Sequence, residues 1–460
     1  CDWPGMLRFP SRLTLMMTRE LADEVTDMHA THWGGPGEDY RLSKISSATI
    51  DSTDGVSAPA PDDVAPVWQP PKPAHSFPWF EVVMTTIGVL GTIGIIIYGL
   101  APESSSVTSF VKTTLLSLVA LVIVVGFLQR IDRWEPEPWT TKLAMFLWGG
   151  GVATLSAMIM NTALSADIAA TIGDIDRAEA LGAAFIAPLV EESLKGIGVL
   201  IIVVVRRNSI NSVLDGVVYA GFSAAGFLFF EDILYFLRTE GQGTQTLVFV
   251  FVVRALLGPF LHVMATSMTG IGLALALLKF KRGWSKTAIV IIFWFFAMLI
   301  HFVWNGSTAL TGSGLGFIAM YLVVGIPGFL LWSILLLRAA RREALHIRDG
   351  LVPYVRTGWI LPGEVSMATD RRARKAAFKW AAQGGRNAKR AMRAFLSDLA
   401  SLGLDQRLMA RHGADPSRIE NDRQMLADAV DNRREFLRLA SIAEQQKDVT
   451  NAVAGRAQVA

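Results

Sequence analysis

The sequence predicts an all-α, polytopic membrane protein: a transmembrane helix bundle of about eight spans with less apolar segments at both ends. The composition is the first reason, since 52% of the 460 residues are hydrophobic and 18% are charged. A mean hydropathy of +0.39 is too high for an ordinary soluble chain. The second reason is that apolar runs of about 20 residues, long enough to cross a hydrocarbon layer of roughly 30 Å, recur along the chain.

Residues 1–78 are expected to form a disordered N-terminal extension. They are mostly polar, have no long periodic run, and become rich in Ser, Ala, Pro and Asp after residue 50. We expect no signal peptide, because no basic segment with an apolar core and a small-residue cleavage site opens the sequence. Cys1 is the only cysteine, which excludes an intramolecular disulfide and a cysteine-based metal site.

The transmembrane domain is predicted over residues 79–338. Apolar runs of spanning length lie at 79–100, 109–128, 140–164, 184–205, 212–238, 246–279, 285–305 and 315–338. Every second loop carries Lys and Arg, whereas the loops at 101–108, 165–180, 239–245 and 306–314 carry almost none. Because short cytoplasmic loops collect basic residues, both termini are expected in the cytoplasm, with the bundle in the plasma membrane.

The run at 246–279 is too long for one span. As a helix it would measure roughly 51 Å, well beyond the hydrocarbon layer. Gly258 and Pro259 predict a break, because proline cannot donate to the preceding turn and glycine loosens it. Arg254, just before the break, is expected to cap a helix or to anchor the interface.

Residues 339–460 are predicted to form a partly helical, basic cytoplasmic tail. They contain 22 Lys+Arg against 14 Asp+Glu, and residues 386–402 and 418–446 have helical character. The basic and aromatic segment 371–380 is typical of a surface that rests on anionic lipid headgroups. Nucleic-acid binding is not expected, since a tail tethered to the membrane already has an anionic partner beside it.

Ionisable side chains within the apolar runs indicate a functional site. A charge inside a bilayer costs several kcal/mol, so such groups pair, face a polar cavity and mark function. The fourth to seventh runs carry Glu191, Glu192 and Lys195; Glu231, Asp232 and Tyr235; His262; and His301 with Asn305. The four helices place Glu191, Glu231, His262 and His301 within about 5–10 Å of the predicted outer edge of the hydrocarbon layer. A similar depth predicts a single site, with Asp232, Lys195 and Tyr235 as supporting residues.

These residues also resemble the motifs of a known family. Glu191-Glu192-Ser193-Leu194-Lys195 resembles the Glu-Glu-x-x-Lys motif of the PrsW family of intramembrane proteases. Phe227 to Glu231 is similar to that family's Phe-x-x-x-Glu motif, His262 to its third-motif histidine, and His301 to Asn305 to its His-x-x-x-Asn motif. The segment from Asp132 to Pro138 resembles its Asp-x-x-Glu-Pro-Glu-Pro element. The resemblance covers roughly residues 80–338 and leaves out both tails.

The resemblance implies an enzyme of the wider group that includes the CAAX prenyl endopeptidases. It implies regulated intramembrane proteolysis of a membrane-anchored partner, since PrsW cuts an anti-sigma factor on its extracytoplasmic side. We therefore expect a single-pass membrane protein as substrate. The CAAX enzymes end their second motif in His where this chain has Glu231, so ligand roles do not carry over from the wider group.

Peptide hydrolysis needs a water molecule, a base and a stabiliser for the oxyanion. We interpret Glu191 as the general base, oriented by Glu192 and Lys195, and Asn305 as the oxyanion donor. Two histidines and a carboxylate are sufficient to hold a catalytic zinc ion with one open position, so Glu231, His262 and His301 are the predicted Zn²⁺ ligands. No His-Glu-x-x-His run is present, and the same groups could activate water without a metal.

Two other classes of function remain open from the sequence. Intramembrane acids and histidines also relay protons or ions in transporters and channels. Inverted repeats would favour a transporter, and we find none. A non-catalytic scaffold that binds membrane proteins is the third alternative, in which the Glu–Lys pair and the histidines serve only helix packing.

Overall fold

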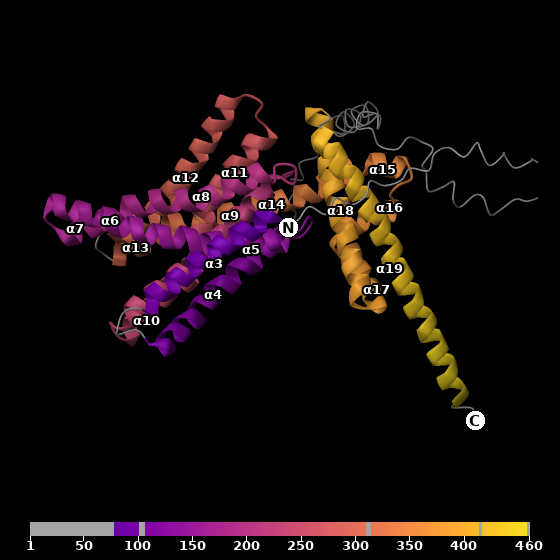
Figure 1. Ribbon diagram of the computed structural model, residues 1–460, viewed down its shortest axis with the longest axis horizontal. Coiled ribbons are helices and arrows are strands. Elements are labelled where there is room, and N and C mark those ends of the chain that lie inside the picture. The colour runs from indigo at the N-terminus through magenta and orange to yellow at the C-terminus, as the bar shows by residue number, and fades with distance from the viewer. Residues whose placement is uncertain (1–77, 101–105, 310–313, 414–415, 458–460) are drawn as a thin grey trace, which may run out of the picture. The chain divides into compact units, whose positions relative to one another are not determined.

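The computed structural model describes residues 78–100, 106–309, 314–413 and 416–457. All regular elements in these ranges are helices, which confirms the all-α prediction. The chain forms two compact units, which meet in sequence between Leu345 and His346 (Figure 1). Apart from its last residue, the predicted disordered extension at 1–78 lies outside the described residues.

The first unit is a bundle of long helices joined by short turns (Figure 1). Its α-helices are α3 Trp79–Leu100, α4 Val107–Ile131, α5 Trp139–Leu147, α6 Thr154–Ile172, α7 Ile175–Leu181, α8 Ala187–Val205, α9 Val213–Glu240, α10 Thr244–Phe251, α11 Leu261–Leu278, α12 Gly283–Ala309, α13 Gly314–Met320 and α14 Ile326–Gly350. Four π-helical segments interrupt them: η4 Trp148–Ala153, η5 Gly182–Ile186, η6 Val252–Leu257 and η7 Tyr321–Gly325.

Seven helices in the described part of the chain are long and apolar enough to cross a membrane. They correspond to seven of the predicted runs. The remaining run, 184–205, is α8 together with part of η5, and it differs from the others by its three buried charges, Glu191, Glu192 and Lys195. The chain is therefore a multi-pass membrane protein.

Helix α9 is the centre of this bundle. In its most apolar stretch 89% of the residues are buried, against 11–44% in the other six spanning helices. Small residues such as Gly216, Gly221 and Ala224 let neighbouring helices approach α9 closely. The outer helices instead expose many Leu, Ile, Val and Phe side chains, as expected of surfaces that face lipid.

Glycines bring η4 into direct backbone contact with its neighbours. A Cβ at Gly149 would lie 1.8 Å from the carbonyl oxygen of Ser223 in α9, and one at Gly151 would lie 1.9 Å from that of Gly88 in α3. No larger residue fits at either position. The π-helical turns were not predicted, because hydropathy marks which residues enter the membrane and does not resolve the helix type.

The break predicted at Gly258 and Pro259 is confirmed, since η6 ends at Leu257 and α11 begins at Leu261. Gly258 allows this turn to pack closely: a Cβ there would lie 2.6 Å from the ring of Trp304. The loop predicted at 165–180 was wrong in extent. Helix α6 continues to Ile172 and α7 begins at Ile175, because a helix satisfies its own backbone hydrogen bonds beyond the end of its apolar sequence.

The second unit is a smaller helical assembly that begins at His346, within the end of α14. Its elements are α15 Val352–Arg356, α16 Pro362–Thr369, α17 Arg371–Ala381, the 3₁₀ turn η8 Ala382–Gly384, α18 Gly385–His412 and α19 Pro416–Ala457. The helical character expected at 386–402 and 418–446 is thus confirmed. Its core contains Phe395 of α18 and Phe436 of α19, whose ring centroids lie 5.4 Å apart.

Candidate active site

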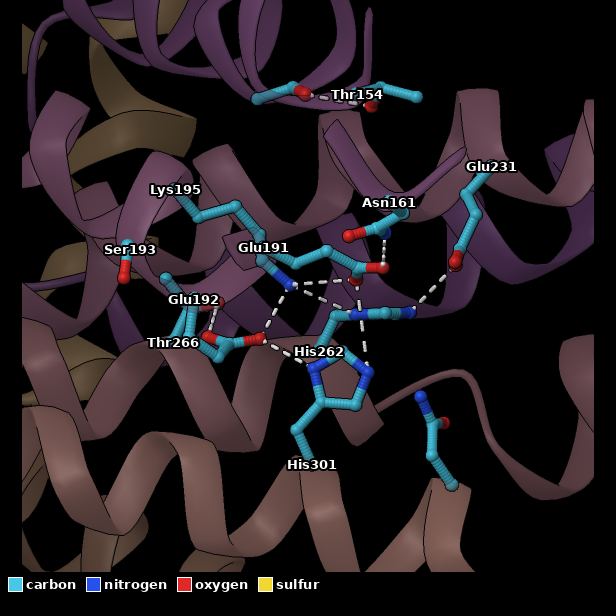
Figure 2. Close-up of polar contacts among 12 residues, drawn as sticks. Thr154, Asn161, Glu191, Glu192, Ser193, Lys195, Glu231, His262, Thr266 and His301 are labelled. Carbon is cyan, nitrogen blue, oxygen red and sulfur yellow. Dashed lines mark hydrogen bonds and ion pairs between the residues drawn. The ribbon is translucent and has the colours of Figure 1, made fainter. Parts of the chain in front are cut away.

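Helix α8 supplies the buried charges around which the site is built. Glu191, Glu192 and Lys195 are 4%, 0% and 0% exposed. Their spacing along the helix places all three on the inward side, because residues three and four apart are neighbours on a helix surface. The Ser193 side chain makes no contact with them in Figure 2. Its hydroxyl donates a hydrogen bond to the carbonyl oxygen of Leu189 (2.6 Å), within its own helix.

The ammonium group of Lys195 joins three members of the site. Its Nζ donates to Glu192 Oε1 (2.5 Å), lies 3.9 Å from Glu191 Oε2, and lies 3.1 Å from His262 Nδ1 (Figure 2). It also lies 4.3 Å from the centroid of the Phe227 ring, a favourable position for a cation. Lys195 therefore holds together α8 and α11 at the level of the predicted site.

Glu192 uses both of its oxygens in hydrogen bonds. Besides Lys195, Oε1 accepts from His301 Nδ1 (3.0 Å), and Oε2 accepts from the Thr266 hydroxyl (2.8 Å). Because a carboxylate only accepts, His301 carries its proton on Nδ1. Nε2 of the same ring is then the acceptor, and it lies 3.8 Å from Glu191 Oε2.

His262 is oriented in the same way by a different carboxylate. Its Nε2 lies 2.9 Å from Glu231 Oε2, which places the proton on Nε2 and leaves Nδ1 to accept from Lys195. The two imidazole rings lie 5.1 Å apart and at 89° to each other. Each histidine therefore donates one N–H to a carboxylate and keeps one lone pair directed at other groups of the site.

Glu191 differs from the other two glutamates of the site. Its Oε1 accepts a hydrogen bond from Asn161 Nδ2 of α6 (3.3 Å). Its Oε2 is buried and accepts no hydrogen bond from any described residue. A buried carboxylate oxygen without a donor is costly in a stable fold, which indicates that a further group is bound there during function.

Glu191, His262 and His301 form a group that fits a metal ion. One ligand atom from each lies within 4.8 Å of the others, and all three residues are buried. A carboxylate and two imidazoles are a common donor set for a catalytic metal, and Glu191 Oε2 lacks a hydrogen-bond donor. The carboxylate that groups with both histidines is thus Glu191, where the sequence predicted Glu231 as the third ligand.

Glu231 instead belongs to an ion pair that the sequence did not predict. The guanidinium group of Arg254 bonds to Glu231 and, through Nε, to Asp232 Oδ1 (2.6 Å). It lies 3.9 Å from the centroid of the Tyr235 ring. The sequence predicted a helix cap or an interfacial anchor for Arg254, and the structure adds this ion pair. An arginine in an apolar run was the signal that could have identified it.

Asn305 lies one turn beyond His301 on α12. Its Nδ2 donates to the carbonyl oxygen of Ala183 in η5 (3.0 Å). The π-helical turn η5 directly precedes α8, so this hydrogen bond connects α12 with the start of the helix that bears Glu191.

The Asp-x-x-Glu-Pro-Glu-Pro element forms a second buried polar cluster. Lys142 donates to Asp132, and the Tyr219 hydroxyl donates to Glu137. Burial raises the pKa of Asp132 to about 7, although Lys142 beside it acts in the opposite direction. These contacts attach the connection between α4 and α5 to α9.

Comparison with known families agrees with this geometry. A model of the PrsW family intramembrane metalloproteases matches residues 137–332, a segment that includes every predicted site residue. No curated protein and no solved structure matches the chain. The match favours a protease over a transporter or a scaffold. Residues 137–332, which carry the four motifs and the converging side chains, are thus similar to the PrsW family intramembrane metalloproteases, and the match supports a protease enzyme.

Proposed function

We propose that this enzyme hydrolyses a peptide bond of a membrane-anchored protein at a site centred on Glu191. The observation that carries the proposal is the buried Oε2 of Glu191, which accepts no hydrogen bond from the described residues although two histidines and a lysine surround it. The bilayer excludes water, so polar groups of the protein must hold the water molecule that attacks the peptide bond. Glu191 Oε2 is an acceptor available to that water molecule.

Glu191 acts as the general base in this proposal and takes a proton from the attacking water at Oε2. Lys195, 3.9 Å from the same atom, compensates its charge. Glu192 holds Lys195 and the His301 ring in place through hydrogen bonds of 2.5 Å and 3.0 Å. Asn305, one turn from His301, is the proposed donor to the oxyanion and would exchange its hydrogen bond to Ala183 for one to the substrate.

The residues that would hold a Zn²⁺ ion are Glu191, His262 and His301. A bound zinc ion would supply Lewis acidity and lower the pKa of a bound water molecule. In that state Glu191 is a ligand rather than the base. The Glu191→Gln variant separates the two roles: retained zinc with loss of cleavage identifies a base, and loss of both identifies a ligand.

The proposed substrate is a single-pass membrane protein, an anti-sigma-factor-like regulator cut near its extracytoplasmic side in the plasma membrane. The family resemblance supports the substrate class, and the basic loops support a cytoplasmic location of both termini. The predicted depth of the site, near the ends of the helices that lack basic loops, supports cleavage on the extracytoplasmic side.

The deciding experiment incubates the purified enzyme with a single-pass membrane protein and follows its cleavage. Glu191→Gln and His301→Ala are expected to lower kcat by at least about 10²-fold, because each removes a group that acts on the reacting atoms. Ser193→Ala is the matched control, since its hydroxyl bonds only to its own helix backbone. Cleavage that persists in both site variants would refute the proposed site.

Chelation tests the metal in the same assay. Loss of activity with a chelator, restored by added Zn²⁺, is the expected result. Full activity in a sample shown to be free of metal would exclude zinc and leave Glu191 as a base that works without one.

We also propose that the second unit binds anionic lipid headgroups through a basic surface on α17 and the start of α18. Its exposed cations are Arg371, Arg372, Lys375, Lys379, Arg386, Lys389, Arg390 and Arg393. No Asp or Glu occurs between Arg371 and Ser397, and Trp380 among them is 38% exposed. Each such cation near an anionic membrane contributes about 1 kcal/mol, so the surface suits a lipid partner.

Reconstitution of the full chain tests this surface. Hydrogen exchange in α17 is expected to slow in nanodiscs that contain phosphatidylglycerol, compared with phosphatidylcholine alone, and the protection should weaken at high salt. Exchanging Arg371, Arg372, Lys375 and Lys379 for Glu should abolish the difference, whereas Arg434→Glu and Arg438→Glu on α19 should not. Protection by added nucleic acid but not by anionic lipid would assign the surface to the other partner.

A further inference from the structure

Arg254 is a partly buried cation that the proposed hydrolysis does not use directly. It lies in the π-helical segment η6, and its side chain is 16% exposed. It lines a small pocket together with His262, Leu228 and Trp304. A charge kept at this position within an apolar helix needs a role, because burying it costs several kcal/mol unless its partners compensate.

The contacts of Arg254 use the shape of the guanidinium group and not only its charge. One nitrogen, Nη2, bonds to Glu231 Oε2, and Nε bonds to Asp232 Oδ1 at 2.6 Å. The central carbon of the group, Cζ, lies over the Tyr235 ring, 3.9 Å from its centroid. A planar fork with several donors can hold two neighbouring carboxylates at once, which the single ammonium group of a lysine cannot do in the same geometry.

The contact with Glu231 connects Arg254 to the site. The same oxygen, Glu231 Oε2, also lies 2.9 Å from His262 Nε2. His262 in turn directs Nδ1 towards Lys195 Nζ at 3.1 Å. A displacement of the Glu231 carboxylate would therefore rotate the His262 ring and move Nδ1 away from Lys195, Glu191 and His301.

We propose that Arg254 is a positioning residue that acts through Glu231 to hold the His262 ring in its productive orientation. The inference rests on the proposed hydrolytic function and assigns that function a residue outside the four motifs. The π-helical turn η6 contributes to this positioning, since the extra residue in its turn changes the direction in which the Arg254 side chain projects.

The first test compares wild type, Arg254→Lys and Arg254→Gln in the cleavage assay. Arg254→Lys keeps the charge but not the fork, and it is expected to lower kcat on the order of 10²-fold with KM changed by less than about 2-fold. Arg254→Gln should be at least as severe. The matched control is Arg238→Lys, an exposed arginine about two turns beyond Glu231 on α9, which should leave both constants unchanged.

The second test measures coupling between Arg254 and Glu231. If Arg254 acts through Glu231, the double variant Glu231→Gln/Arg254→Lys should have the same kcat as Glu231→Gln alone, within about 2-fold. Effects that multiply in the double variant would show that Arg254 acts by another route and would overturn the inference.

Thermal unfolding of every variant shows whether a lower kcat comes from a displaced His262 ring or from loss of the fold. Should Arg254→Lys fail to fold, Asp232→Asn decides: it keeps the shape but weakens the second contact of the guanidinium group, and a loss of kcat is expected. If Arg254→Lys, or Asp232→Asn in its place, is folded and has an unchanged kcat, the inference about Arg254 is overturned and the proposed function is not affected. A wild-type enzyme that cleaves no membrane protein overturns the proposed function and this inference together.

Discussion

Lys195 and Glu192 both stabilise the helix bundle and hold other side chains of the site in position. Both are fully buried, and their ion pair is closed by hydrogen bonds from Thr266 and His301 to the carboxylate. Two charges inside a helix bundle are tolerated when the attraction and the added hydrogen bonds offset their desolvation. Glu192 is therefore a structural support of the site as well as a neighbour of Glu191.

Glu192→Gln is predicted to damage both stability and activity. The substitution keeps the shape but leaves the Lys195 ammonium without its carboxylate, so the free energy of unfolding should fall by about 3–5 kcal/mol. It also weakens the hydrogen bond that orients His301, and kcat should fall on the order of 10²-fold. Denaturation in detergent and the cleavage assay measure the two effects. Ser193→Ala should change neither, and a Glu192→Gln enzyme with wild-type stability would contradict this account.

Asp422 in α19 is a buried acid of a different kind. It is 0% exposed, and neither carboxyl oxygen accepts a hydrogen bond from a described residue. Burial and the nearby Asp405 raise the pKa of Asp422 from 3.8 to about 9. Folding then takes up a proton between these two pH values, so the second unit should lose stability as the pH rises from about 4 towards 9.

Asp422→Asn is predicted to remove this pH dependence. The amide cannot ionise, so the variant should exceed wild type in stability at pH 8 by on the order of 2–5 kcal/mol and by much less at pH 5. Hydrogen exchange of α18 and α19 at the two pH values measures the difference. Asp428→Asn, at an exposed position of the same helix, is the control. A variant less stable than wild type at pH 8 would refute the prediction.

At the scale of elements, glycines and π-helical turns decide how the helices meet. Trp148 at the start of η4 donates from Nε1 to the carbonyl oxygen of Leu194, next to Lys195 (3.0 Å). The same short segment touches the backbone of α9 at Gly149. The position of α8 relative to α9 therefore depends on η4, which is the reason that a packing segment influences the site.

Gly149→Ala is predicted to destabilise the bundle by about 3 kcal/mol or more and to lower activity with it. Its Cβ would lie 1.8 Å from a backbone oxygen, which cannot rotate away, so the helices must separate. Gly126→Ala in α4 is the matched control. Nothing lies within 4 Å of its Cβ, and a glycine removed from a helix interior is expected to raise stability by about 0.5–1 kcal/mol. Melting temperatures in detergent compare the two, and equal values for both variants would contradict the packing argument.

At the scale of the whole molecule, the membrane explains how apolar and polar residues are distributed. The outer helices expose apolar side chains while α9 is enclosed, the arrangement expected when lipid surrounds the bundle. The charged residues Glu191, Glu192 and Lys195 turn inward to one another, since lipid offers them no partner. The orientation of the bundle is the remaining large-scale property, and it determines on which side the substrate is cut.

Cysteine labelling is predicted to place the turn after α9 outside and the turn before α12 inside the cell. Gly241 and Gly283 suit this test, because no atom lies within 4 Å of a Cβ at either position. In a Cys1→Ser background, an impermeant maleimide added to intact cells should label Gly241→Cys but not Gly283→Cys, as the basic residues Lys281 and Arg282 predict. The reverse pattern would move the proposed cleavage to the cytoplasmic side.

The sequence by itself determined that the chain is a helical membrane protein, and it predicted that Glu191, Glu192, Glu231, His262 and His301 form one site. Both follow from local properties: hydropathy selects the spans, and a charge within an apolar run is too costly to be incidental. The limits of α6 and the four π-helical turns could not be predicted, because helices continue past their apolar sequence and backbone register leaves no hydropathy signal.

Only the tertiary structure decided how these residues are paired. It placed ligand atoms of Glu191, His262 and His301 within 4.8 Å of one another, and it paired Glu231 with Arg254 from a segment 23 residues away. Helical periodicity predicts which residues share a face of one helix. Which faces of different helices meet depends on close contacts such as that of Gly149 with Ser223, and those arise from packing between segments far apart in the chain.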